Sequence, residues 1–157
     1  MKISSLSRRA GKALKAKGYT LVTAESCTGG WVAQEVTSIA GSSEWFERGY
    51  VTYSNAAKRE ALGVRKATLE RHGAVSEPTA REMARGALRR SRGTIAVSIT
   101  GIAGPGGGSP GKPVGTVCFA WAQGRKIRSE TRRFNGGRRN VRRQSVVHAL
   151  RGVLKWL

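Results

Sequence analysis

The sequence predicts an α/β fold, a three-layer α/β/α sandwich around a mixed, mostly parallel sheet. Helix-type and strand-type hydrophobic patterns alternate through the first half of the chain, which is typical of a parallel sheet covered by helices. Residues 94–100 form a near-continuous apolar run, as expected of a strand that is buried on both faces. Residues 114–122 and 126–134 follow a hairpin pattern, so part of the sheet is expected to be antiparallel. The 157 residues have the length of one domain, which we expect to span positions 1–157.

The first part of the chain predicts two helices and two strands in alternation. Residues 4–17 carry an apolar stripe at helical spacing, and Gly18 ends that helix. Residues 19–24 are apolar and β-branched, which predicts a strand. Residues 28–39 have a second helical stripe, and residues 48–53 predict a second strand.

Three helical segments are expected next. Ser54 is placed to cap a short helix that runs through Leu62. Residues 66–72 have room for one or two helical turns. A serine cap with a proline in the first turn predicts another helix from Ser76 to about Arg92.

The remaining elements complete the sheet and close the chain. The strand at residues 94–100 is expected at the centre of the sheet, and a loop dense in glycine and proline follows at residues 101–113. The predicted hairpin turns around Gly124, and from about Gly137 the pattern is helical to the end of the chain.

The composition is strongly basic and restricts the possible chemistry. There are 29 Lys and Arg residues against 9 acidic residues, a formal net charge of +20, and every acidic residue is a glutamate. A Ser-His-Asp triad is therefore excluded unless Glu replaces Asp. The two cysteines and two histidines are not clustered, so we expect no structural zinc site, no other metal and no cofactor. The charge fits either a polyanion-binding surface or a solvated basic surface.

The chain contains no apolar run of the roughly 18 residues that a membrane span needs, and its first residues contain no signal-type apolar segment. We therefore expect a cytoplasmic protein with no membrane partner. Two distant cysteines agree with a reducing compartment.

The glycine-rich loop invites comparison with nucleotide-binding motifs. Residues 106–112 spell G-x-x-x-x-G-K, but Pro113 stands where a Walker A loop has Ser or Thr, and a strand follows instead of a helix. We therefore reject both the Walker and the dinucleotide motif. Two interpretations stay open: a backbone that approaches a ligand at the carboxyl end of the central strand, or an ordinary connection.

A second short segment, AESCTGG, places two potential nucleophiles where a strand passes into a helix. Ser26 would lie above the first amides of that helix, which are suited to hold an oxyanion. Alternatively, Ser26 or Thr28 only caps the helix. Cys27 should point to the opposite side and fill the core as a buried thiol. Tyr53 and Lys58, in YVTYSNAAK, are candidate polar partners, although a half-buried aromatic and a solvated lysine would give the same pattern.

Five blocks taken together resemble one protein family. AESCTGG, YSNAAK, HGAVSEPTAREMA, TGIAGPGGG with KPVGTV, and FNGGRRNVR resemble, in this order, the C-terminal domain family of the competence-damage-inducible protein CinA. The resemblance implies a three-layer α/β/α sandwich with a mixed sheet. Some members act alone as amidohydrolases that convert nicotinamide mononucleotide to nicotinate mononucleotide and ammonia. It also implies that Ser26, Tyr53 and Lys58 form the catalytic group, with Ser26 as nucleophile and Tyr53 or Lys58 as acid and base.

We expect the substrate to be a small pyridine nucleotide held by backbone and arginine donors. Arg138 and Arg142 lie four residues apart near a helix start, which suits a phosphate site but also a basic surface stripe. The candidate substrate-binding residues are Thr28, Gly29, Gly30, Thr100, Gly101, Ala103, Gly104, Arg138 and Arg142. Homo-oligomerisation and non-specific contact with nucleic acid are left open.

Amide hydrolysis by this group needs a base that is neutral near pH 7. The reference pKa of both Tyr and Lys is about 10 or higher. Burial and positive charge lower the pKa of a lysine, and Arg59 lies next to Lys58. The chain departs from the family where Gly137 replaces a common Asp, which we expect to affect capping of the last helix. The alternatives are a basic nucleic-acid-binding module and a non-catalytic ligand-binding member of the same fold.

Overall fold

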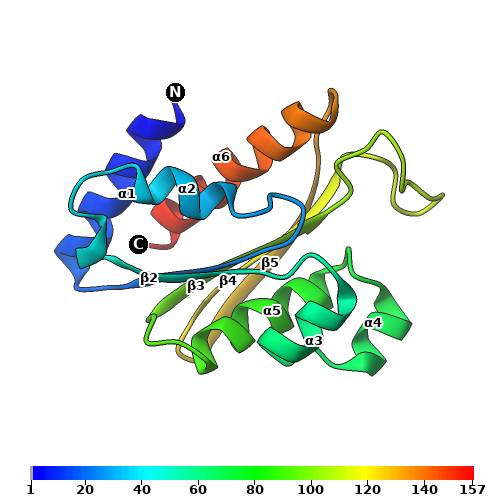
Figure 1. Cartoon of the computed structure of the whole chain (residues 1–157), viewed down its shortest axis with the longest axis horizontal. Coiled ribbons are helices and arrows are strands. Elements are labelled where there is room, and N and C mark those ends of the chain that lie inside the picture. Colours follow the sequence, from blue (N-terminus) through cyan, green and yellow to red (C-terminus); the bar gives the residue numbers. More distant parts are fainter. Residues whose placement is uncertain (1) are drawn as a thin grey trace.

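The computed structural model describes residues 2–157 and has one five-stranded sheet with helices on both faces (Figure 1). The strand order is β2-β1-β3-β4-β5. β1 pairs in parallel with β2 and β3, while β3–β4 and β4–β5 are antiparallel, which confirms the mixed α/β fold. The elements are α1 (Ile3–Lys17), β1 (Leu21–Glu25), α2 (Trp31–Thr37), η1 (Ser42–Glu44, a 3₁₀ turn), β2 (Phe46–Val51), α3 (Asn55–Leu62), α4 (Lys66–His72), α5 (Glu77–Arg89), β3 (Ile95–Gly101), β4 (Thr116–Gln123), β5 (Lys126–Arg133) and α6 (Arg138–Trp156).

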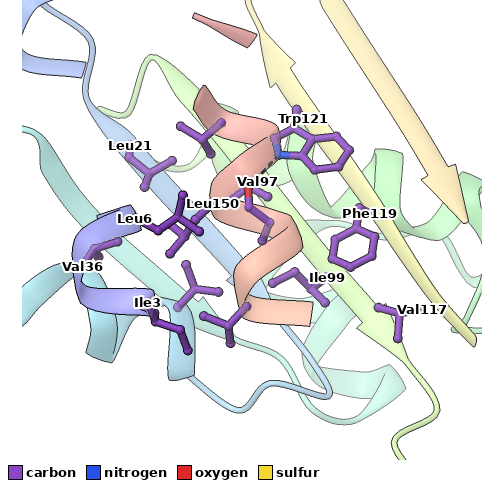
Figure 2. Close-up of a cluster of buried hydrophobic side chains, with 14 of the residues drawn as sticks. Ile3, Leu6, Leu21, Val36, Val97, Ile99, Val117, Phe119, Trp121 and Leu150 are labelled. Carbon is purple, nitrogen blue, oxygen red and sulfur yellow. Dashed lines mark hydrogen bonds between the residues drawn. The ribbon is translucent and has the colours of Figure 1, made fainter. Parts of the chain in front are cut away.

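Figure 1 shows the three layers: α1, α2 and α6 cover one face of the sheet, and α3, α4 and α5 cover the other. The first face buries the larger side chains, among them Leu21, Trp121 and Leu150 (Figure 2). Trp121 satisfies its indole N–H by donating to the carbonyl of Ala149 in α6, at 3.2 Å. The second face is built mainly from small residues of α5 and the strands, which let that helix pack close to the sheet.

Most predicted elements are present, and the differences have local causes. α2 begins at Trp31 rather than 28, because Gly29 and Gly30 adopt left-handed backbone angles, with φ of 60° and 98°. β2 occupies Phe46–Val51 rather than 48–53. Its parallel register with β1 ends where Glu25 pairs with Val51, so Tyr53 lies beyond the strand. The 3₁₀ turn η1 was not predicted, and α5 ends at Arg89 rather than about 92.

The parallel strands bring three loops to one edge of the sheet. β1, β2 and β3 run in the same direction, so Ser26 after β1, the segment after β2 and the glycine-rich loop after β3 meet at their carboxyl ends. The strand at residues 94–100 is β3, and it lies at the centre as predicted. Open α/β sheets generally bind ligands at such an edge.

No helix within residues 2–157 has both the length and the apolar character needed to cross a membrane.

Candidate active site

Ser26 and Lys58 are in direct contact beyond the end of β1. The Nζ of Lys58 donates to Ser26 Oγ at 2.9 Å. The same amine donates to the backbone carbonyls of Thr52 at 2.9 Å and Tyr53 at 3.2 Å. Lys58 is only 1% exposed, so this lysine is a buried side chain with three polar partners and not a solvated one.

Local structure explains why Lys58 points at Ser26. Ser54 caps α3, since its hydroxyl accepts from the N–H of Ala57 at 3.0 Å. The cap fixes the start of the helix just after Thr52 and Tyr53. Lys58 then lies at the end of the first turn, close enough for its side chain to return to the strand ends.

Burial lowers the pKa of Lys58 below its usual value. A thiolate at Cys27 would oppose this shift. However, burial also raises the pKa of the Cys27 thiol to about 12, so the thiol is neutral near pH 7. Arg59, expected to contribute through its charge, is exposed and is not among the causes of the shift.

A cavity of about 260 Å³ opens above this pair. Eight of the residues predicted to form the site line this cavity: Ser26, Tyr53, Lys58, Thr100, Gly101, Ala103, Gly104 and Arg138. Residues that the sequence analysis did not assign to a site also line it: Cys27, Asn55, Ala74, Val75, Ile102, Gly106 and Gly107. Ala74 and Val75 were visible in the block HGAVSEPTAREMA, but nothing in their chemistry distinguishes them from core residues.

Arg138 and the side chain of Tyr53 lie together at the mouth of the cavity. One guanidinium nitrogen of Arg138 donates to the carbonyl of Gly104 at 2.8 Å, and the other donates to the hydroxyl of Tyr53 at 3.1 Å. Tyr53 is 61% exposed. Only its backbone carbonyl reaches Lys58, and its hydroxyl faces Arg138.

Arg142 lies outside the cavity lining and holds the loop that follows Ser26. Its Nε donates to the carbonyl of Cys27 at 3.0 Å, and a terminal nitrogen donates to the carbonyl of Thr28 at 3.3 Å. The guanidinium also lies over the ring of Trp31. The two arginines of the predicted anion site are therefore separated in role: Arg138 faces the cavity, and Arg142 supports the loop below it.

Thr28, Gly29 and Gly30 also lie outside the cavity lining. The hydroxyl of Thr28 donates to Glu25 Oε1 at 2.6 Å. Glu25 is 1% exposed, and its carboxylate also accepts from the N–H groups of Val32 at 2.9 Å and Ala33 at 3.1 Å. Glu25 was missed in the sequence, although an acidic residue just before a helix start is a recognisable signal.

The start of α6 lacks a side-chain cap. Gly137 occupies the cap position with an extended backbone and no side chain to accept from the first N–H groups of the helix. This agrees with the expectation that the missing Asp affects the cap. Arg138 follows directly, as the first residue of the helix.

Within residues 2–157, no three His, Cys, Asp or Glu side chains gather in a group able to hold a metal ion. The glycine-rich loop leads into strand β4 and not into a helix, in agreement with the prediction that it is not a Walker A loop.

The model of the CinA C-terminal domain matches residues 3–157. The chain is 61% identical over 150 residues to the nicotinamide-nucleotide amidohydrolase PncC of Escherichia coli strain K12, covering 94% of this chain and 90% of that protein. It is 52% identical over 155 residues to the PncC of Enterobacter agglomerans, covering 98% and 94%. A CinA superfamily protein from Klebsiella pneumoniae 700603 has a similar structure, with a TM-score of 0.96, 41% identity and coverage of 99% and 97%.

Proposed function

This chain belongs to the CinA C-terminal domain family, and on that premise we propose that it hydrolyses nicotinamide mononucleotide to nicotinate mononucleotide and ammonia. The relatives named nicotinamide-nucleotide amidohydrolase, which match over nearly their whole length, support this substrate. The observation that carries the mechanism is the buried contact between Lys58 Nζ and Ser26 Oγ.

The hydrogen bonds of Lys58 suit a neutral amine. An ammonium has three N–H donors, while the neutral amine has two N–H donors and one lone pair. The two carbonyls, of Thr52 and Tyr53, accept the two N–H groups. In this neutral form the third contact of Nζ is reversed: the bond that an ammonium donates to Ser26 Oγ becomes one in which the Ser26 hydroxyl donates to the lone pair of Nζ. The lowered pKa of Lys58 favours this form.

The reaction proceeds in two halves. Ser26 Oγ bonds to the carboxamide carbon while its proton passes to Lys58 Nζ, and the carbonyl π electrons move to the oxygen. When the intermediate collapses, the carbon–nitrogen bond breaks and the Lys58 proton leaves with the nitrogen as ammonia. Water then attacks the serine ester, gives a proton to Lys58, and Ser26 recovers that proton as nicotinate mononucleotide is released.

Arg138 is suited to bind the substrate phosphate. Its guanidinium lies at the cavity mouth, with the carboxamide end of the substrate directed inward to Ser26. Arginine binds phosphate with two parallel hydrogen bonds. The hydroxyl of Tyr53, bonded to Arg138, orients that guanidinium. We therefore assign the base to Lys58 and place Tyr53 at the phosphate end.

Ammonia release tests this proposal. The purified protein should release one ammonia for each nicotinate mononucleotide formed, and Ser26→Ala should lower kcat by at least about 10³-fold, because the nucleophile is lost. Ser43→Ala, an exposed serine of η1, serves as the matched control and should keep the wild-type rate.

Two results would contradict the proposal. Ammonia release by Ser26→Ala at the wild-type rate would show that Ser26 is not the nucleophile. Binding of nicotinamide mononucleotide by the wild-type protein without turnover would identify a non-catalytic ligand-binding member of the family.

A further inference from the structure

The reaction requires a donor for the negative oxygen that forms when Ser26 attacks, and the start of α2 does not supply it. The first amides of this helix were the expected donors. However, the N–H groups of Val32 and Ala33 already donate to the carboxylate of Glu25. The N–H of Trp31 donates to the carbonyl of Thr28 at 3.0 Å. Thr28, Gly29 and Gly30, which precede the helix, do not line the cavity, so we expect the oxyanion donors among the residues that do line it.

The N–H of Cys27 is one such donor. The peptide between Ser26 and Cys27 is trans, so its C=O and N–H point in opposite directions. The carbonyl of Ser26 accepts from Gly29 N at 3.0 Å, which turns the N–H of Cys27 away from the loop. Within residues 2–157 this N–H donates to no oxygen atom; its one neighbour is its own sulfur, a weak acceptor. Cys27 lines the cavity and is 6% exposed.

The N–H of Ala103 is the second donor. Ile102, the preceding residue, donates to the carbonyl of Thr116 at 2.9 Å and accepts from Gly115 N at 2.8 Å, so it faces the β4 side. The peptide between Ile102 and Ala103 is trans, and the N–H of Ala103 therefore points to the other side of β3, where β1 ends at Ser26. In the described part of the chain this N–H has no acceptor, although Ala103 is buried and lines the cavity.

Two glycines bring these segments together. A Cβ at Gly101 would lie 3.1 Å from the sulfur of Cys27 and 2.8 Å from a methyl carbon of Val117, so glycine allows the end of β3 to approach the Cys27 segment. Gly104 has a φ of 86°, and a Cβ there would collide with Val114. The backbone can therefore turn sharply directly after Ala103.

We propose that the backbone N–H groups of Cys27 and Ala103 form the oxyanion site of this enzyme. Buried backbone N–H groups without a partner are rare in native structures, which indicates that these two await an acceptor from the substrate. This assignment rests on the proposed amidohydrolase function, in which the acceptor is the carboxamide oxygen of the substrate. It gains the π electron pair as Ser26 Oγ bonds to the carbon, and returns the pair when ammonia leaves. An amide next to the nucleophile and a second from another loop form the same kind of site in other serine hydrolases.

The test removes one N–H and keeps the rest of the site. Replacing Ala103 with lactic acid by nonsense suppression changes the N–H to an ester oxygen with nearly the same shape. We expect kcat to fall about 10²- to 10³-fold while KM changes much less, because the bond strengthens only in the transition state. Ala103→Pro also removes the N–H and should show the same loss, whereas Ala103→Gly keeps it and should lose far less.

Ala40 provides the matched control for both substitutions. It lies in an exposed turn outside the cavity lining, and within residues 2–157 its N–H also has no acceptor. Lactic acid at position 40 should leave kcat unchanged.

The outcomes separate this inference from the proposed function. If the Ala103 ester variant keeps the wild-type kcat while Ser26→Ala is inactive, the oxyanion assignment is overturned and the serine mechanism stands. If Ser26→Ala is as active as the wild type, the proposed serine mechanism is wrong, and the oxyanion assignment that rests on it is wrong as well. A rise in KM with kcat unchanged would indicate a contact that binds the substrate and the transition state equally, and would also overturn the assignment.

Discussion

Lys58 combines two properties that seldom occur together in a lysine, complete burial and a defined set of acceptors. Removing an ammonium from water is costly, so the neutral amine is favoured inside the protein. The position of the lysine at the start of α3 acts in the same direction, because the positive end of a helix disfavours a cation. The residue that we propose as the base is thus one whose charged form the fold destabilises.

The pH dependence of the enzyme should follow from this residue. Below the pKa of Lys58 the amine is protonated and cannot accept the Ser26 proton, so kcat/KM should fall on the acid side. Because burial lowers that pKa, the fall should begin below the reference value of about 10.4. The measurement is a pH–rate profile of ammonia release.

Lys58→Met and Lys58→Arg should both abolish this acidic limb along with most of the activity. The arginine variant keeps the positive charge but cannot act as a base at these pH values. An acidic limb that persists unchanged in Lys58→Met would assign the base to another group.

The sequence indicates some of these residues and gives no signal for others. Ser26 was identified as a potential nucleophile from its position between a strand and a glycine pair, and Lys58 from the resemblance to a family. The spacing of Lys58 in the chain gave no sign that it returns to β1, because that contact depends on the parallel pairing of β2 with β1. The proposed donors at Cys27 and Ala103 would act through backbone N–H groups, which nearly every residue type possesses, so the composition carries no signal for them.

At the scale of elements, α2 begins with a cap that comes from the preceding strand. Gly30, its own cap residue, has no side chain, and Glu25 supplies the acceptors instead. From the other side, Arg142 holds the carbonyls of Cys27 and Thr28. The loop after Ser26 is therefore fixed between an anion, which accepts from the hydroxyl of Thr28 and from the first amides of α2, and a cation, which donates to the loop carbonyls.

Glu25→Gln should weaken this arrangement. An amide group presents an NH₂ where the carboxylate presents an oxygen, so one of the three donors facing Glu25 loses its acceptor inside the protein. We expect a loss of about 1–3 kcal/mol in the free energy of unfolding, measured by urea denaturation.

Glu35→Gln is the matched control for this substitution. Glu35 lies on the same helix and accepts from the indole N–H of Trp31 at 2.9 Å, which a glutamine oxygen can also do. Equal unfolding free energies for the two variants would show that the buried cap contributes nothing particular.

The order of elements was predictable, while some of their boundaries were not. Alternating patterns gave the helices and strands, and Ser54 and Ser76 cap helices as expected. The start of α2 depended on the left-handed angles of Gly29 and Gly30, and the end of β2 on its register with β1. Neither is encoded in the residues of the element itself.

At the scale of the whole molecule, the charge is concentrated on one layer. Neither α1 nor α6 contains an acidic residue, and both lie on the same face of the sheet (Figure 1). The basic residues of these helices are Arg8, Arg9, Lys12, Lys15, Lys17, Arg138, Arg139, Arg142, Arg143, Arg151 and Lys155. Since α6 begins at the cavity mouth, this positive field extends to the site where we propose that an anionic substrate enters.

Association with the substrate should therefore depend on salt. We expect kcat/KM for nicotinamide mononucleotide to fall several-fold as NaCl rises from about 20 to 300 mM, because ions screen the attraction between the protein and the phosphate. Nicotinamide riboside, which lacks the phosphate, serves as the control substrate. The same salt dependence for both compounds would show that the field does not act on the phosphate.

The layered architecture was predicted from the sequence, but the lateral order β2-β1-β3-β4-β5 was not. Periodicity shows that residues 94–100 are buried on both faces without identifying their neighbours. The placement of β1 between β2 and β3 is what brings three separate loops to one edge. The site is thus a property of the topology as much as of its residues.

The dependence on α6 has a consequence for protein synthesis. A ribosome completes every strand of the sheet, together with Ser26 and Lys58, before it translates the codons for Arg138 and Arg142. A nascent polypeptide at that stage contains the proposed nucleophile but neither the arginine at the pocket entrance nor the one beneath the loop. Translation that terminates early should therefore yield an inert product, and enzymatic competence should appear only when the last helix has left the exit tunnel.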